Sequence, residues 1–155
     1  MTESSAHMLA EIQAAAEKHG DWAQLDLSQA PNIHIAIMSE PFLSFVLAGK
    51  KTVESRFSLK KIAPYSKAQP GDIVFMKAGP IVACFTVAWV KTFDMDEYPI
   101  AQIAKEYGEQ ICGDTAFWKR KSAKRFATLM GIQDVRNLTP TKITKLDQRA
   151  WATLS

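Results

Sequence analysis

The sequence is poor in side chains that bind metals or form disulfides. Its 155 residues include two cysteines, without a Cys-x-x-Cys motif, and three histidines, all in the N-terminal part. Because no cysteine and histidine stand at the spacing of a metal site, we expect no metal and no bound cofactor. Cys84 lies within an apolar run and is expected to be a buried free thiol, whereas Cys112 lies in a turn-like segment.

Long hydrophobic runs, internal repeats and low-complexity segments are also absent from the sequence. The longest apolar run covers residues 81–90, whereas a membrane-spanning helix needs about 20 apolar residues. The N-terminus is polar and alanine-rich, without the basic start and apolar stretch of a signal peptide. We therefore expect a cytoplasmic protein with reduced cysteines and no contact with membranes.

The length and composition are those of one folded domain. Apolar residues make up 47% of the chain and charged residues 23%, which is enough apolar material for a single core. The formal net charge of +3 is only weak evidence for a polyanionic partner, so the local distribution of charge carries more information. These numbers leave the oligomeric state open.

The first half of the chain alternates helical and strand patterns. Met8, Ile12 and Ala15 recur at helical spacing, and Gly20 follows as a stop signal. Residues 21–32 are expected to be irregular. The predicted elements are a helix over 5–19, a strand over 33–38, a short helix over 42–48, and strands over 52–57 and 73–77.

The second half is rich in strands and turns. Turn signals at 70–72 and 78–80 stand on both sides of the strand over 73–77, so residues 73–91 are expected to form a hairpin. Strands outnumber the helices that could cover them, which favours a small α+β barrel-like fold. The later elements are a strand over 81–91, a helix over 99–107 that ends at Gly108, a helix over 115 to about 124 capped by Asp114 or Thr115, a strand over 126–132 that residues 135–138 either continue or bend away from, and a strand over 151–154.

A cluster of charged residues lies where the short helix passes into the next strand, in the stretch AGKKTVESRF. Gly49 is expected to end the helix, and Lys51 stands at the entry to the strand. Thr52, Glu54 and Arg56 alternate along the strand and share one face. Two interpretations are open: a solvated strand edge, or a polar cleft in which the cations bind phosphate or polarise a carbonyl while Glu54 orients them.

Further candidate residues flank this cluster. Ser39 is expected to cap the short helix, whose N-terminus with Phe42 would then receive an anion, and Lys77 is expected to line the same cleft. Tyr65 and Trp151 could stack on a base, although packing is the simpler interpretation. A basic stretch is the candidate nucleic-acid-binding surface. Its cations either bind phosphates or are solvated on a helix whose aromatic side chains pack in the core. The stretch comprises Trp118, Lys119, Arg120, Lys121, Lys124 and Arg125.

Three segments in order resemble the ASCH domain family. MSEPFLSFVLAGKKTVESRF resembles its signature, a short helix ending in G-x-K followed by x-x-E-x-R, with Gly49, Lys51, Glu54 and Arg56 in all four places. PGDIVFMKAG resembles the next family segment. Residues 117–154 resemble its C-terminal part, with an aromatic-basic helix, a strand and the pattern Asp147-x-Arg149-x-Trp151, which we interpret as structural.

The resemblance implies a PUA-like fold, a pseudo β-barrel of about five or six mixed strands with several short helices. We place this domain at residues 31–155, after an N-terminal helical extension over 1–30. The resemblance also implies binding of RNA or of a modified nucleoside as the function.

Some members of the family resemble this chain in fold and hydrolyse acylated cytidines, and others are linked to ribonuclease activity. The resemblance implies that Lys51 is the catalytic base, with Glu54 beside it. In the amidohydrolase branch the nucleophile is a threonine three residues after the lysine, where this chain has Glu54, and Glu106 or Glu109 would supply the remaining acid. The alternatives to a binding domain are therefore a hydrolase acting on N4-acylated cytidine or RNA, and a protein-interaction module that uses its N-terminal helix.

Overall fold

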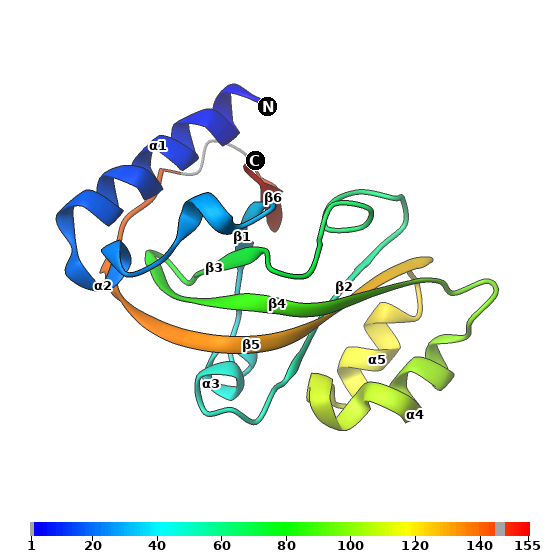
Figure 1. Cartoon of the computed structure of the whole chain (residues 1–155). Coiled ribbons are helices and arrows are strands. Elements are labelled where there is room, and N and C mark those ends of the chain that lie inside the picture. Colours follow the sequence, from blue (N-terminus) through cyan, green and yellow to red (C-terminus); the bar gives the residue numbers. More distant parts are fainter. Residues whose placement is uncertain (1, 145–147) are drawn as a thin grey trace.

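One curled, mixed sheet organises the molecule. The computed structural model describes residues 2–144 and 148–155. Its six strands lie in the order β2-β5-β4-β3-β1-β6, with β1 and β3 parallel and all other neighbours antiparallel (Figure 1). The predicted α+β fold with a barrel-like sheet is confirmed. The strands are β1 (Ile33–Ile37), β2 (Val53–Ser58), β3 (Ile73–Lys77), β4 (Ile81–Asp94), β5 (Phe126–Thr141) and β6 (Trp151–Thr153).

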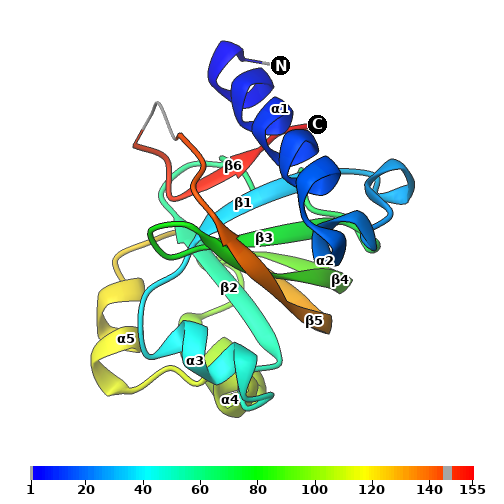
Figure 2. The same cartoon turned by 90° about the vertical axis from the view of Figure 1, so that its left-hand side faces the viewer.

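The helices form two groups at opposite sides of the sheet (Figure 2). The first group lies near β1 and β3, and the second lies beside β2, with α3 also in contact with β5. None of the helices in the described parts of the chain is both long and apolar enough to cross a membrane. The first group is α1 (Glu3–Lys18), α2 (Gly20–Ala23) and the 3-10 helix η1 (Leu27–Gln29), and the second is α3 (Phe42–Leu47), α4 (Ile100–Ile111) and α5 (Thr115–Lys121).

Several predicted boundaries are wrong because tertiary contacts override local signals. Gly108 does not end its helix, which continues to Ile111 and stops where Cys112 adopts a left-handed conformation with φ 63°. Gly20 starts α2, so the segment over 21–32 is partly helical. Of the two alternatives left open for residues 135–138, the structure shows the continuation: they belong to β5, which stays paired with the long strand β4 across register shifts.

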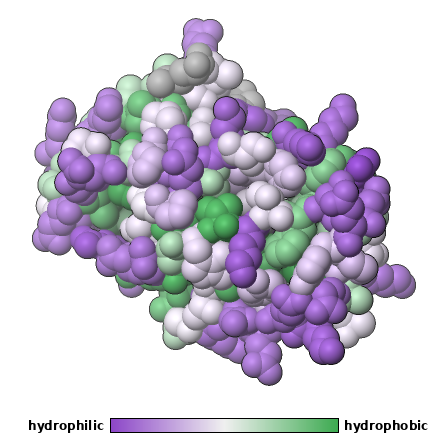
Figure 3. Space-filling view, turned by 45° about the vertical axis from the view of Figure 1, so that its right-hand side comes forward, coloured by the Kyte–Doolittle hydropathy of each residue, from purple (hydrophilic) through white to green (hydrophobic). Residues whose placement is uncertain are grey.

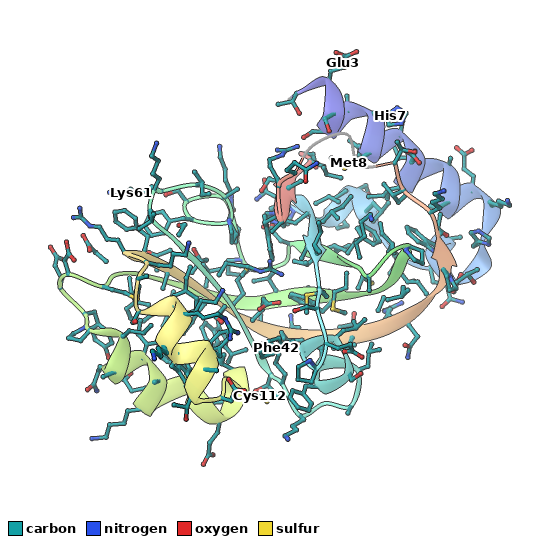
Figure 4. All side chains as sticks on the ribbon, turned by 180° about the vertical axis from the view of Figure 1, so that it is seen from behind. Glu3, His7, Met8, Phe42, Lys61 and Cys112 are labelled. Carbon is teal, nitrogen blue, oxygen red and sulfur yellow. The ribbon has the colours of Figure 1, made fainter. Side chains whose placement is uncertain are left out.

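The N-terminal helix completes the main hydrophobic core. Met8 and Ile12 of α1 are fully buried in one cluster with residues of β1 and β3. Figure 4 shows Met8 on the inner side of α1, and Glu3 and His7 on its outer side. Trp22 of α2 stacks on Phe75 with ring centroids 5.2 Å apart. The apolar stripe of α1 is thus covered by the domain itself, and the predicted boundary at residue 30 stays a prediction.

Asp72, the last residue of the PGD turn, ties β1 to β3. Its buried carboxylate accepts hydrogen bonds from the backbone N–H of Asn32 at 2.9 Å and of Gln69 at 2.8 Å. It also lies 2.6 Å from Nε2 of His34, whose Nδ1 accepts the indole N–H of Trp151 at 3.1 Å. This chain of contacts fixes the position of Trp151 on β6.

Candidate functional site

The candidate site lies where the curled sheet brings its two edges together. In the strand order, β2 and β6 are the two edge strands. Arg56 of β2 nevertheless reaches across, because its guanidinium carbon lies 5.1 Å from the ring centroid of Trp151 on β6. Its Nη2 donates to the carbonyl of Ile37, at the end of β1, at 3.0 Å. The predicted charged cluster is therefore at a seam of the sheet.

The turn between α3 and β2 delivers Lys51 to this seam. Gly49 has φ 76°, and its N–H donates to the carbonyl of Val46, while Lys50 N–H donates to the carbonyl of Phe45. This is a Schellman motif, as expected for a glycine at that place. The predicted Ser39 cap is wrong: the side chain that accepts a hydrogen bond from the first turn, from the N–H of Ser44 at 2.8 Å, is that of Glu40.

Lys51 is buried and fully engaged. Its Nζ donates to the carbonyls of Val53 and Ile111, each at 2.8 Å, and lies 3.8 Å from Oε1 of Glu54. The Phe42 ring centroid is 5.3 Å away. Burial lowers the pKa of Lys51, and the carboxylate of Glu54 acts in the opposite direction. The amine is therefore easier to deprotonate than an exposed lysine.

Glu54 stands between the two cations. Its Oε1 accepts the N–H of Ser55 at 2.7 Å, and its Oε2 lies 3.6 Å from Nη2 of Arg56. Among the described residues, three buried polar atoms of this strand have no hydrogen-bond partner: Glu54 Oε2, Ser55 Oγ and Arg56 Nε. A buried polar atom left without a hydrogen bond costs about 1–3 kcal/mol, so these three atoms are positions at which an ordered water or a ligand could form hydrogen bonds.

A cavity of about 150 Å³ opens beside this cluster. Four basic side chains and one carboxylate line it, together with apolar and small polar groups. Desolvation lowers the pKa of Lys121, and nearby Arg56 and Arg120 lower it further. On the face in Figure 3, hydrophobic areas are bordered by hydrophilic side chains. The lining residues are Ile37, Met38, Ser39, Phe42, Lys51, Glu54, Ser55, Arg56, Phe117, Arg120 and Lys121.

Most of the predicted ligand-binding residues meet in this cavity. Five come from the motif region, namely Ser39, Phe42, Lys51, Glu54 and Arg56. Lys77 does not line it, because it ends β3 where its carbonyl accepts the N–H of Met38 at 2.9 Å. Neither Glu106 nor Glu109 lines the cavity.

The basic stretch does not form one surface. The helix predicted over 115 to about 124 ends at Lys121, so Lys124 and Arg125 follow the helix and do not lie on its faces. Arg120 and Lys121 line the cavity, whereas Lys119 and Lys124 are exposed elsewhere. Arg125 forms ion pairs with Asp94 at 3.1 Å and Asp96 at 3.3 Å on the hairpin side.

The candidate stacking rings are engaged in packing. Trp118 donates its indole N–H to the carbonyl of Gly113 at 3.1 Å, and Tyr65 packs edge-on against Phe126 with centroids 5.4 Å apart. Trp151 is buried against His34. The structural role predicted for the pattern Asp147-x-Arg149-x-Trp151 depends in part on Asp147, which lies outside the described residues.

Sequence reasoning missed the backbone partners of the site. The carbonyl of Ile111 holds Lys51, and the carbonyl of Ile37 holds Arg56. Neither contact could be predicted from the sequence, because every residue has a backbone carbonyl and no residue type marks the ones that accept these hydrogen bonds. Across the described parts of the chain, no three acidic, histidine or cysteine side chains gather as metal ligands.

Comparison with solved structures shows the same fold. ASCH from Zymomonas mobilis matches with a TM-score of 0.57 and 14% identity, over 71% of this chain and 73% of that chain. A protein from Enterococcus faecalis V583 matches with a TM-score of 0.54 and 13% identity, over 85% of this chain and 96% of that chain. No protein-family model and no curated protein matches the sequence significantly. The chain therefore has an ASCH-like fold, as the sequence resemblance implied.

Proposed function

We propose that the domain binds RNA or a modified nucleoside, with one nucleotide entering the cavity at the seam. The observation that carries this proposal is the cluster of buried Lys51, Glu54 and Arg56 with three unpaired polar atoms. A carboxylate oxygen accepts hydrogen bonds from an exocyclic amino group, and an arginine N–H donates to a ring nitrogen or carbonyl. Glu54 and Arg56 therefore offer an acceptor and a donor side by side, which suits the edge of a base.

The surrounding charge supports a phosphorylated ligand. Arg120 and Lys121 of α5 line the cavity, and neither has an ion-pair partner among the described residues. Arginine and lysine bind phosphate oxygens through charge-assisted hydrogen bonds. The ASCH-like fold supports the same class of partner, because the family is linked to RNA and nucleosides.

Titration of the purified protein with a single-stranded RNA octamer, cytidine and N4-acetylcytidine tests this proposal. Chemical-shift changes are expected at Lys51, Glu54 and Arg56, and octamer binding should weaken as salt rises because phosphate contacts release counterions. Lys121→Ala is expected to weaken octamer binding about tenfold, the loss of one charged hydrogen bond. Lys124→Ala is the matched control, because this exposed lysine does not line the cavity. Equal effects of the two substitutions, or no binding at low salt, would refute the proposal.

A hydrolase acting on N4-acylated cytidine or on RNA is the second candidate, and the lowered pKa of Lys51 is the observation that favours it. A neutral amine has two N–H donors, which match the carbonyls of Val53 and Ile111, and its lone pair stays available to accept a proton from water. Water would then add to the acetyl carbonyl of N4-acetylcytidine, and cleavage would release acetate and cytidine.

Chromatography of the same titration mixtures separates the two candidates. The hydrolase predicts product from N4-acetylcytidine or from the RNA, and loss of that product in Lys51→Met. If the wild type binds and releases no product, the binding domain is retained and the hydrolase is excluded for these substrates. The interaction module stays a third prediction, although α1 has no exposed apolar stripe to offer a partner.

A further inference from the structure

A second hollow continues from the cavity along the seam. It measures about 530 Å³ and shares Arg56 and Lys121 with the cavity. We call it the side groove, and define it by Phe57, Ile62, Pro64 and Trp151 between these two cations. The same two side chains thus border both spaces, so a ligand larger than one nucleoside would pass between them.

We infer that the side groove is a second subsite, which takes the nucleotide next to the one in the cavity. The partner is then a single-stranded RNA and not a free nucleoside. This inference rests on the proposed function of the cavity. Lys121 would bind the phosphate that links the two nucleotides, because it lines both spaces, while Arg56 at the same border contacts the base in the cavity.

The charges that line the two neighbouring hollows indicate into which of them a polyanion bound in the cavity would extend. Arg56, Lys121 and Arg149 line the side groove, and no carboxylate does so among the described residues. A third hollow beside the cavity, of about 640 Å³, shares Arg120 with it, and its lining combines two cations, Lys50 and Arg120, with three carboxylates, those of Glu40, Glu109 and Asp114, so carboxylates outnumber cations there. A strand with one negative charge per nucleotide is repelled there and attracted to the side groove.

The apolar surface of the side groove suits the face of a base. Ile62 is 60% exposed, although it is a large aliphatic residue beside Phe57 and Pro64. Lys121 lies over the Phe57 ring, with its Nζ 5.9 Å from the centroid, and keeps an ammonium above apolar surface. Proteins hold single strands on aromatic side chains bordered by cations, since every base has a π-face, and Phe57 is an aromatic side chain of this groove. The hollow lined by the three carboxylates also includes Cys112. Figure 4 shows Cys112 well apart from Lys61, the residue that precedes Ile62.

The test uses two substitutions that place the same charge on one loop. Ile62→Glu puts a carboxylate into the side groove, and Leu59→Glu puts one on an equally exposed residue, 62% against 60%, that does not line it. Neither residue is buried, so both variants are expected to fold. Binding is measured by calorimetry with a mixed-sequence single-stranded RNA octamer and with the four nucleoside 5′-monophosphates.

The inference predicts that the wild type binds the octamer more tightly than any monophosphate. Ile62→Glu should weaken octamer binding at least tenfold more than Leu59→Glu does, and should leave monophosphate binding unchanged. If monophosphates bind as tightly as the octamer, or if the two variants behave alike, the side groove is not a subsite while the cavity keeps its function. If neither ligand binds the wild type, the proposed function fails first, and the subsite fails with it.

Discussion

Lys51 carries a charged amine into the interior of the domain. Its side chain is only 2% exposed, and burial lowers its pKa below the ordinary value of 10.5. In the unfolded chain the same amine is solvated and titrates near that ordinary value. The folded and unfolded states therefore bind different numbers of protons at alkaline pH, which couples the charge of Lys51 to stability.

We predict that the wild type gains stability relative to Lys51→Met as the pH rises toward 10.5. Between the lowered folded pKa and 10.5 the unfolded state binds more protons, so the free energy of unfolding rises with pH across this window. Below the window both states are protonated, and the burial cost of the charge is present in full. Urea denaturation of both proteins from neutral pH upward measures the difference, in which titrating groups that do not interact with Lys51 cancel. Parallel curves would contradict a lowered pKa.

At the scale of elements, two glycines with the same local signal have opposite roles. Gly49 and Gly108 both follow helical patterns, and the sequence predicts a helix end at each. Gly49 has φ 76° in the Schellman motif that turns the chain toward Lys51, whereas Gly108 lies within α4. A Cβ added at either position would meet no atom within 4 Å, so only the backbone conformation distinguishes them.

Gly49→Ala is therefore expected to destabilise the protein by about 1–2 kcal/mol, because an L side chain strains the left-handed conformation. Gly108→Ala is expected to stabilise it by about 0.5–1 kcal/mol, because alanine favours a helix interior. Thermal or urea unfolding of both variants measures these changes. The assignment of the two helix ends fails if both substitutions change stability in the same direction.

At the scale of the whole molecule, α1 and the sheet form one hydrophobic core. Met8 and Ile12 are fully buried against β1 and β3, and Trp22 donates its indole N–H to the carbonyl of Thr139 on β5 at 2.9 Å. Both ends of the chain lie near one another on this side (Figures 1 and 2). The N-terminal residues are therefore expected to unfold together with the sheet, although they lie outside the segments that resemble the ASCH family.

Ile12→Ala is predicted to lower the free energy of unfolding by about 2–5 kcal/mol, the cost of removing a large aliphatic side chain from a core. Its neighbour Gln13 is exposed, and Gln13→Ala should change stability by less than about 0.5 kcal/mol. Denaturation followed by far-ultraviolet circular dichroism and by tryptophan fluorescence tests both. Separate unfolding transitions for the helix and the sheet, or equal effects of the two variants, would show that α1 does not fold cooperatively with the sheet.

The order of the elements and the content of the charged motif could be predicted from the sequence. Periodicity, capping residues and turn signals act over a few neighbouring residues, so they located the strands, the Asp114 cap and the Gly49 turn. The alternation of β2 also placed Glu54 and Arg56 on one face, where both line the cavity. These features depend on local conformation, which the sequence determines through each residue's own backbone and side-chain preferences.

Only the tertiary structure decided whether these charges face solvent or each other. The curl of the sheet brings β2 to β6, and the end of α4 supplies the carbonyl of Ile111 to Lys51 from 60 residues away. The tertiary structure also separates the residues of the basic stretch, since Arg120 and Lys121 line the cavity while Arg125 forms an ion pair with Asp94. Such contacts depend on how distant elements pack, and packing energy is not carried by any short stretch of sequence.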